Sequence, residues 1–246
     1  MPTVAVVIIG DEILSGKFAD ENGPHLIRRL RELGADLGRL VTIGDSVAGI
    51  AREVAFCAAE HDLVVTTGGV GPTHDDMTLD GIGAAFGLEM EQHPRLVALL
   101  ESYGMDLNPA ALRMATIPSG SELIGGSGTS YPVLRVRNVY VFPGVPRLMR
   151  KKFEAVSDLF AGERVHTTRL KTLLRETEIA GALSDAQQAS PDVAIGSYPR
   201  FDDEPWHVII TLESRDPNAL QTAEARIRQT VPISDELGTE AVVDGS

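Results

Sequence analysis

The 246-residue chain is poor in cysteine, and this shortage restricts its chemistry. Cys57 is the single cysteine, so the chain can form no internal disulfide and no thiolate metal cluster. It lies in the apolar stretch VAFCAAEH, which is typical of a helix. We therefore interpret Cys57 as a buried, unreactive thiol rather than a nucleophile.

Basic residues are also scarce. The 22 lysines and arginines are outnumbered by 35 aspartates and glutamates, which gives a formal net charge of −13. Nucleic acid and anionic membranes repel such a surface, so we expect neither as a partner. An anionic ligand would have to be held by local features, such as backbone amides, a helix N-terminus or a metal ion.

Long hydrophobic runs are missing as well. The apolar stretch TVAVVIIG has no basic residues before it and is followed at once by the polar stretch DEILSG, which argues against a signal peptide. No run approaches the length that a membrane span requires. We therefore expect a cytoplasmic protein.

The first 162 residues alternate strand and helix patterns. Continuous β-branched runs predict buried strands at 3–10, 36–45 and 62–69, and amphipathic stretches predict the helices between and after them. Residues 131–144 predict a hairpin that turns at Asn138, and residues 145–160 predict one helix with Val145, Leu148, Met149 and Phe153 on its apolar face. This rhythm favours a mostly parallel sheet with helices on both sides.

A second, smaller unit is predicted at 163–232, where continuous apolar strand patterns give way to strands in which apolar and polar residues alternate. HTTRLKTL, DVAIGSYP and WHVIITLES predict strands, and ETEIAGALSDAQQA predicts a helix. A last helix follows Asp216, which we expect to cap it, with Pro217 in its first turn. The order is β-α-β-β-α, and we expect residues 233–246 to form a flexible tail.

Glycine followed by acidic residues comes after each of the three predicted parallel strands, in GDEILSG, TIGDS and TTGGVGPTHDD. Ligands bind beyond the carboxyl ends of such strands. Glycines let backbone amides face an anion, and carboxylates suit a hard cation. The acidic residues that could converge there are Asp11, Glu12, Asp45, Asp75 and Asp76. Together these loops predict a site for a phosphorylated ligand and a metal ion.

These loops also have simpler interpretations. GGVGP could be only a tight turn, since it lacks both the GK[ST] of a P-loop and the G-x-G-x-x-G spacing. Aspartate is favoured at helix N-termini; we favour that role for Asp75 and a functional role for Asp76. We interpret His74, Lys17 and Arg147 as solvated surface residues, although the side chain of Lys17 or Arg147 could touch a phosphate. FPGVPRLM could be a pocket wall or merely a rigid turn.

The motifs GDEILSG, TTGGVGPTHDDMT and VYVFPGVPRLM, in this order and spacing, resemble the molybdopterin-binding (molybdenum cofactor biosynthesis) domain superfamily from Thr3 to about Phe160. Within it, the chain is most similar to the amino-terminal domains of FAD synthase and of the competence/damage-inducible protein A (CinA) family. IGSYPRF and HVIITLES extend the similarity to FAD synthase, and GTSYPV replaces the more common GTAPG. The resemblance implies a three-layer α/β/α sandwich and a homo-oligomer.

The resemblance also implies site residues. Asp45 and Asp76 match the functional acids, and we expect them to act in catalysis and to hold a metal ion. The expected nucleotide- or pterin-binding residues come from the strand-end loops: Gly10, Asp11, Glu12, Ser15, Gly16, Thr67, Gly68, Gly69, Gly71, Pro72, Thr73, Gly144 and Pro146.

The implied function is metal-dependent hydrolysis of the pyrophosphate bond in an adenine dinucleotide, FAD or ADP-ribose. The implied cofactor is divalent magnesium or cobalt, with potassium as a further ion. The alternatives are adenylylation or binding of molybdopterin, and a module that binds a nucleotide without turnover. The sequence contains neither the adenylyl-transferring domain of FAD synthase nor the amidohydrolase domain found in CinA relatives, so we expect neither activity from these residues.

Overall fold

The computed structural model describes residues 2–126, 131–201, 203, 205 and 207–234, and the chain divides into two units. Unit 1 covers residues 1–163 and unit 2 covers residues 164–246. In the described residues no helix is long and apolar enough to cross a membrane.

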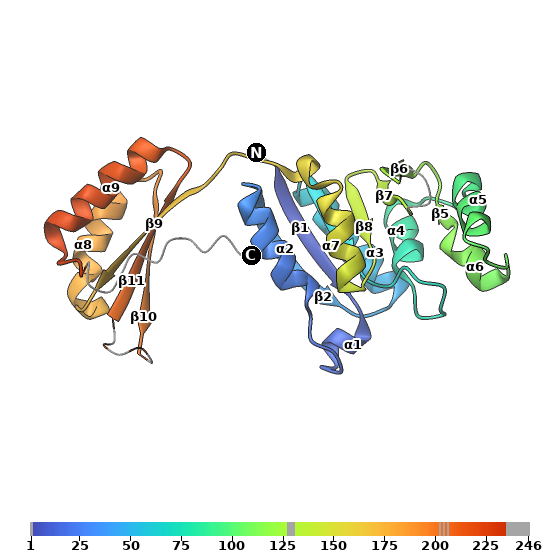
Figure 1. Ribbon diagram of the computed structural model, residues 1–246, viewed down its shortest axis with the longest axis horizontal. Helices are drawn as coiled ribbons and strands as arrows, with labels where there is room; N and C mark the ends of the chain where they lie inside the picture. The colour runs from blue at the N-terminus through green and yellow to red at the C-terminus, as the bar shows by residue number, and fades with distance from the viewer. Residues whose placement is uncertain (1, 127–130, 202, 204, 206, 235–246) are drawn as a thin grey trace. The chain divides into compact units, whose positions relative to one another are not determined.

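A six-stranded sheet forms the centre of unit 1, in the order β2-β1-β3-β8-β7-β6 (Figure 1). Its strands are β1 (Thr3–Ile9), β2 (Asp36–Ile43), β3 (Leu63–Thr67), β6 (Glu122–Ile124), β7 (Val133–Val136) and β8 (Val139–Phe142). Strands β2, β1, β3 and β8 are parallel, β7 is antiparallel to β8, and β6 is antiparallel to β7. The predicted mostly parallel sheet is thus confirmed, and so is the predicted hairpin, which β7 and β8 form.

Helices cover both faces of this sheet, because successive side chains of a strand point to opposite faces. On one face Val7 belongs to a buried cluster with Ile50 of α3 (Val47–Glu60) and Ile82 of α4 (Thr78–Phe86). On the other face Val6 belongs to a second buried cluster. This cluster contains Leu26 of α2 (Asn22–Glu32) and also residues of α7 (Pro146–Glu154). The three-layer sandwich is therefore the observed architecture.

Short elements complete unit 1. Helix α1 (Asp11–Leu14) follows β1, and α5 (Pro94–Ser102) and α6 (Pro109–Met114) accompany a two-stranded ribbon of β4 (Met90–Gln92) and β5 (Thr116–Pro118). Strands β4, β5 and β6 were not expected from the sequence. Three residues are too few to show a period of two.

The helix predicted over 145–160 is shorter than expected and is followed by a separate turn. Helix α7 ends at Glu154, and a 3-10 helix, η1 (Ser157–Phe160), follows. The Ser157 hydroxyl donates to the Glu154 carbonyl at 3.0 Å, a bond that competes with continued α-helix. Met149 and Phe153 are fully buried, whereas Val145 and Leu148 are exposed, so the predicted apolar face was only half right.

Unit 2 has the predicted β-α-β-β-α order. Its elements are β9 (His166–Thr172), α8 (Glu176–Ala189), β10 (Ala194–Arg200), β11 (His207–Ser214) and α9 (Pro217–Thr230), with an antiparallel sheet ordered β10-β11-β9. Asp216 caps α9 as expected, because its carboxylate accepts from the Asn218 N–H at 2.8 Å. Of the predicted tail, Ser234 donates its N–H to the Lys171 carbonyl at 2.8 Å, and residues 235–246 lie outside the described part.

Candidate functional site

The carboxyl ends of β1 and β2 bring two acidic residues together. The Asp11 N–H donates to the Asp45 carboxylate at 2.8 Å, and the Asp45 N–H donates to the Asp11 carboxylate at 3.3 Å. Burial raises the pKa of the Asp45 carboxyl, and the negative charges of Asp11, Glu12 and Asp75 raise it further. The predicted convergence is thus observed for Asp11, Glu12, Asp45 and Asp75.

The glycine loop after β3 lies against this acidic edge. Gly68 has a φ of 105°, and a Cβ atom there would lie 2.0 Å from the Ile9 carbonyl oxygen, so only glycine fits. A Cβ atom on Gly69 would lie 3.2 Å from a carboxylate oxygen of Asp45. The Thr78 hydroxyl, at the start of α4, fixes the loop by donating to the Gly68 carbonyl at 2.7 Å.

Three consecutive backbone N–H groups of this loop are unpaired. Within the described part of the chain, the N–H groups of Gly69, Val70 and Gly71 donate to no protein acceptor, whereas the Gly68 N–H donates to the Phe142 carbonyl. A run of neighbouring N–H groups around residues with positive φ, as at Gly69, forms a concavity that suits an anion. The loop is therefore a candidate phosphate-binding segment.

Asp76 folds back onto the same loop. Its carboxylate accepts from the Thr73 N–H at 2.8 Å and from the Thr73 hydroxyl at 2.5 Å, and it lies beside Gly71. The predicted capping role of Asp75 is wrong, because the N-cap of α4 is Met77 and no side chain caps the helix. The His74 side chain is exposed, as expected.

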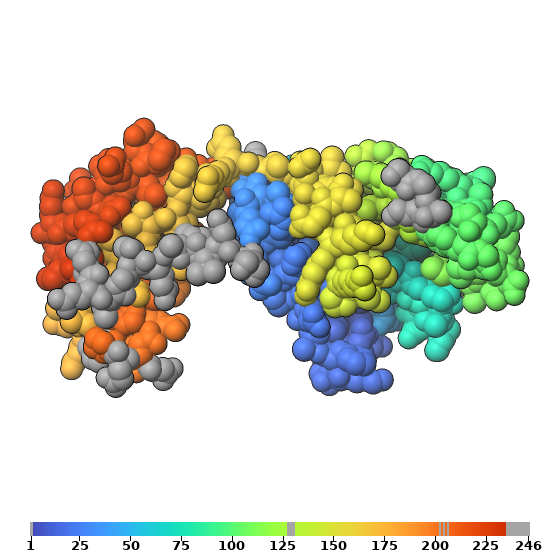
Figure 2. Space-filling view, in the orientation of Figure 1, coloured from blue at the N-terminus to red at the C-terminus, as the bar shows by residue number. Residues whose placement is uncertain are grey.

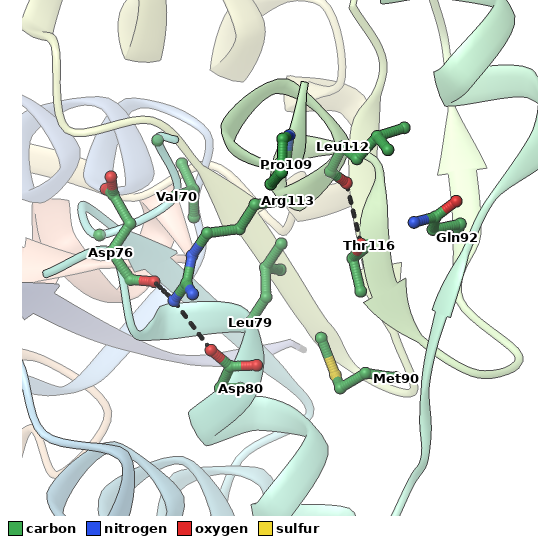
Figure 3. A pocket seen from close by; sticks show the side chains of 12 residues that line it. Val70, Asp76, Leu79, Asp80, Met90, Gln92, Pro109, Leu112, Arg113 and Thr116 are labelled. Carbon is green, nitrogen blue, oxygen red and sulfur yellow. Dashed lines mark hydrogen bonds and ion pairs between the residues drawn. The ribbon is translucent and has the colours of Figure 1, made fainter. Parts of the chain in front are cut away.

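A cavity of about 430 Å³, which we call the loop cavity, opens beside the unpaired N–H groups (Figure 3). It is lined by Gly69, Val70, Gly71, Asp76, Leu79, Asp80, Met90, Gln92, Pro109, Leu112, Arg113 and Thr116. Arg113 of α6 reaches across it, donating to the Asp76 carbonyl at 2.6 Å and to the Asp80 carboxylate at 3.0 Å. Lys17 and Arg147 are the basic residues nearest the glycine loops in the sequence, but neither lines this cavity.

A second cavity, of about 290 Å³, lies between the ends of β1, β3 and β8, and we call it the crevice. Five predicted residues line it: Glu12, Thr67, Gly68, Gly144 and Pro146. Sequence reasoning missed Asn22, whose buried amide donates to the Thr67 hydroxyl at 3.0 Å and to the Gly144 carbonyl at 2.7 Å. Asn22 therefore joins α2 to two of the predicted loops.

The remaining predicted residues line neither the loop cavity nor the crevice. Gly10 pairs with the end of β2 through its N–H, which donates to the Ile43 carbonyl at 3.0 Å. Pro72 and Thr73 form the exposed tip of the glycine loop. Ser15 and Gly16 end α1 and line neither cavity.

A ready-made metal cluster is not present in the described residues, where no three His, Cys, Asp or Glu side chains converge to hold an ion. The donor chemistry nevertheless suits a hard cation, because Asp11 and Asp45 crowd two carboxylates at one strand end. Magnesium is commonly held by one or two carboxylates, with substrate phosphates and water completing its coordination. These residues therefore fit an ion that arrives with its substrate.

Comparison with known proteins now identifies the family. A family described as "Probable molybdopterin binding domain" matches residues 5–161. The chain belongs to this family. A second family, "FAD synthase, middle domain", matches residues 164–237.

Individual relatives agree with both matches. A probable FAD synthase of Caenorhabditis elegans is 32% identical over 92% of this chain and 49% of its own length. A CinA-like protein of Citrifermentans bemidjiense is 31% identical over 92% of this chain and 57% of its own length. The crystal structure of CinA from Thermoplasma acidophilum, 28% identical, superposes with a TM-score of 0.59 over 65% of this chain and 99% of that chain. The chain spans about half the length of the FAD synthase relative.

Proposed function

We propose that unit 1 hydrolyses the pyrophosphate bond of an adenine dinucleotide, FAD or ADP-ribose, with the help of a divalent metal ion. The observation that carries the proposal is the run of unpaired N–H groups at 69–71, which has the Asp45 carboxylate at one end and the Asp76 carboxylate at the other. Amides of this kind bind phosphate oxygens, whereas carboxylates beside them repel phosphate unless a cation intervenes. The FAD synthase relatives support a nucleotide as the ligand.

The reaction needs few groups. Water adds to one phosphorus, the bridging oxygen leaves with the other phosphate, and two monophosphates result: FMN and AMP from FAD, or AMP and ribose 5-phosphate from ADP-ribose. The loop amides orient the phosphates, and Arg113 stands on the same cavity as a positive charge. We assign to Asp76, which lines the loop cavity, the role of orienting the attacking water. A divalent ion held by Asp45 and Asp11 would supply the charge that neutralises the phosphates.

A second candidate uses the same site. The family description favours binding of molybdopterin, and the resemblance adds its adenylylation as an alternative; a phosphate cradle and a cation suit both. Incubating the purified chain with FAD, with ADP-ribose, and with ATP plus molybdopterin separates the two. We expect AMP to be released from FAD or ADP-ribose when Mg²⁺ or Co²⁺ is present, with K⁺ tested as an addition. Pyrophosphate release from ATP in the presence of molybdopterin, without AMP release from FAD or ADP-ribose, would favour the second candidate.

Asp76→Asn provides the sharpest test, because it keeps the size and much of the hydrogen bonding of the side chain but removes its charge. We expect metal-dependent hydrolysis to fall by about 100-fold or more, on the order of the loss of one key electrostatic group. Thermal unfolding should hardly change, since the side chain lies at a loop rather than in the core.

Asp36→Asn is the matched control, because Asp36 is an exposed aspartate at the opposite end of β2 from Asp45. It should leave hydrolysis unchanged. Full activity in Asp76→Asn, or wild-type activity that persists in excess chelator, would contradict the proposal. An Asp76→Asn protein that unfolds would show instead that the bonds to Thr73 are structural.

A further inference from the structure

Unit 1 contains a third cavity, of about 250 Å³, which is mostly apolar and which we call the apolar cavity. Val70, Leu79, Tyr131, Leu148 and Lys152 are the lining residues that matter here. Lys152 is the one lining side chain, in the part of the chain that the structure describes, that carries a formal charge. A pocket of this kind, with apolar walls and one placed polar group, is typical of small-molecule sites.

Lys152 is held in an unusual setting for a lysine. Its ammonium donates to the carbonyls of Tyr131 and Pro132, the latter at 3.0 Å, and lies 5.0 Å from the centre of the Tyr131 ring. Burial, together with the neighbouring charge of Lys151, lowers the pKa of the amine to about 8. No carboxylate pairs with Lys152 among the described residues. An ammonium has three N–H donors, so one remains for a ligand.

The apolar cavity adjoins the loop cavity. Val70 and Leu79 line both, and Val70 carries one of the three unpaired N–H groups. A ligand whose phosphate lay on the loop could therefore extend into the apolar cavity past the Val70 side chain. The part that enters would have to be mostly apolar and to offer an acceptor to Lys152.

We propose that the apolar cavity binds a planar heteroaromatic ring that carries a carbonyl oxygen, with Lys152 donating a hydrogen bond to that oxygen. The inference rests on the proposed function in one respect, that this ring is joined to the phosphate. Flavin and pterin rings have such carbonyl groups, whereas adenine has no carbonyl and accepts only through its ring nitrogens. We therefore expect the cavity to take the half of a dinucleotide that is not adenosine, and so to favour FAD over ADP-ribose.

Riboflavin, which has the ring and no phosphate, tests the cavity without any hydrolysis. We expect saturable quenching of riboflavin fluorescence by the wild-type chain, and no competition by adenosine. Lys152→Met keeps a similar length and removes the donor, so it should weaken riboflavin binding about tenfold, as expected for a hydrogen bond to a charged group. It should also raise the KM for FAD and leave the KM for ADP-ribose unchanged.

Two further variants make the test specific. Lys151→Met removes an exposed charge from the next residue and should leave riboflavin binding unchanged. Leu148→Glu places a charge on the wall of the cavity at a side chain that is 48% exposed, so the fold should tolerate it while riboflavin binding weakens. Circular dichroism checks that each variant is folded.

Several outcomes would overturn the inference: no saturable quenching by the wild-type chain, equal losses in Lys151→Met and Lys152→Met, or unchanged binding in Leu148→Glu. An altered oligomer mass in Leu148→Glu with unchanged riboflavin binding would assign this wall to contacts between copies, against the proposal. The two proposals fail separately. Riboflavin binding without FAD hydrolysis refutes only the proposed function, and FAD hydrolysis without riboflavin binding refutes only this inference.

Discussion

Asp45 and Lys152 are both placed where burial works against their charged forms. Burial raises the pKa of the Asp45 carboxyl and lowers that of the Lys152 amine to about 8. Each group therefore costs the folded chain stability at pH 7 rather than adding to it. Groups with such shifts occur often where a ligand completes the site, which agrees with the cavity that Lys152 lines and with the position of Asp45 beside Gly69 of the glycine loop.

At neutral pH we expect the half-buried Lys152 ammonium to destabilise unit 1, and raising the pH should relieve this. The folded chain loses the proton at about pH 8, while an unfolded lysine keeps it until about pH 10.4. In that window the unfolded state binds more protons, so stability rises with pH. Urea unfolding midpoints at several values between pH 7.5 and 9.5 should show this rise in the wild type relative to Lys152→Met.

The comparison with Lys152→Met is needed because other buried groups act in the opposite direction. Burial raises the pKa of the Cys57 thiol to about 11, so Cys57 makes stability fall as the pH rises above its ordinary value of about 8.5. The same high pKa supports the interpretation of Cys57 as an unreactive thiol. Parallel midpoint curves for the wild type and Lys152→Met would contradict the assignment of a destabilising charge to Lys152.

At the scale of elements, α4 packs with the backbone of its Gly81 directly against the Ile50 side chain of α3. A Cβ atom on Gly81 of α4 would lie 2.5 Å from the Cγ2 atom of Ile50 of α3, closer than any real contact. The glycines in α4, which weaken it as an isolated helix, are thus used for packing. This contact matters for the site because α4 begins where the glycine loop ends, at Thr78.

Gly81→Ala should destabilise unit 1, although alanine is the better helix former. Overpacking of this kind costs about 1–3 kcal/mol. Gly181→Ala in α8 is the matched control, because a Cβ atom there meets nothing within 4 Å. It should stabilise unit 2 by about 0.5–1 kcal/mol through helix propensity. The midpoint of thermal unfolding measures both effects. Shifts of this midpoint in the same direction for the two variants would refute the packing argument.

At the scale of the whole molecule, exposed apolar side chains indicate where copies of the chain could meet. The buried residues of α7, Met149 and Phe153, belong to the core of unit 1, so that face of the helix is not available to a second copy. Leu14 is 57% exposed and Phe18 is 60% exposed, and the segment that begins with α1 projects from unit 1 (Figure 2). Projecting apolar side chains of this kind suit an interface.

We therefore expect the protein to self-associate through the α1 segment, in line with the tendency that the family resemblance implied. Light scattering should give a multiple of the 26.4 kDa chain mass at micromolar concentrations. Phe18→Ser should lower the mass, and Leu159→Ser, which alters an equally apolar side chain that is 45% exposed on η1, should not. A monomer mass across this range, or the opposite response of the two variants, would count against the prediction.

The sequence by itself determined the elements whose cause is local. The β-branched run of β1 requires burial on both faces, the Ser46 hydroxyl accepts from the Gly49 N–H at 3.2 Å to start α3, and Gly68 occupies a backbone conformation closed to other residues. These features also placed Asp11 and Asp45 at one sheet edge, because the ends of neighbouring parallel strands must meet there.

Only the tertiary structure decided which distant residues share a cavity. Arg113 lies 37 residues after Asp76 yet donates to its carbonyl, and Asn22 lies 122 residues before Gly144 yet joins it to β3. Lys152 is half-buried beside a cavity whose walls come from helices α4, α5, α6 and α7 and from strands β5 to β8. No periodicity in the sequence encodes these contacts, since they depend on how whole helices pack against the sheet rather than on the residues next to them in the chain.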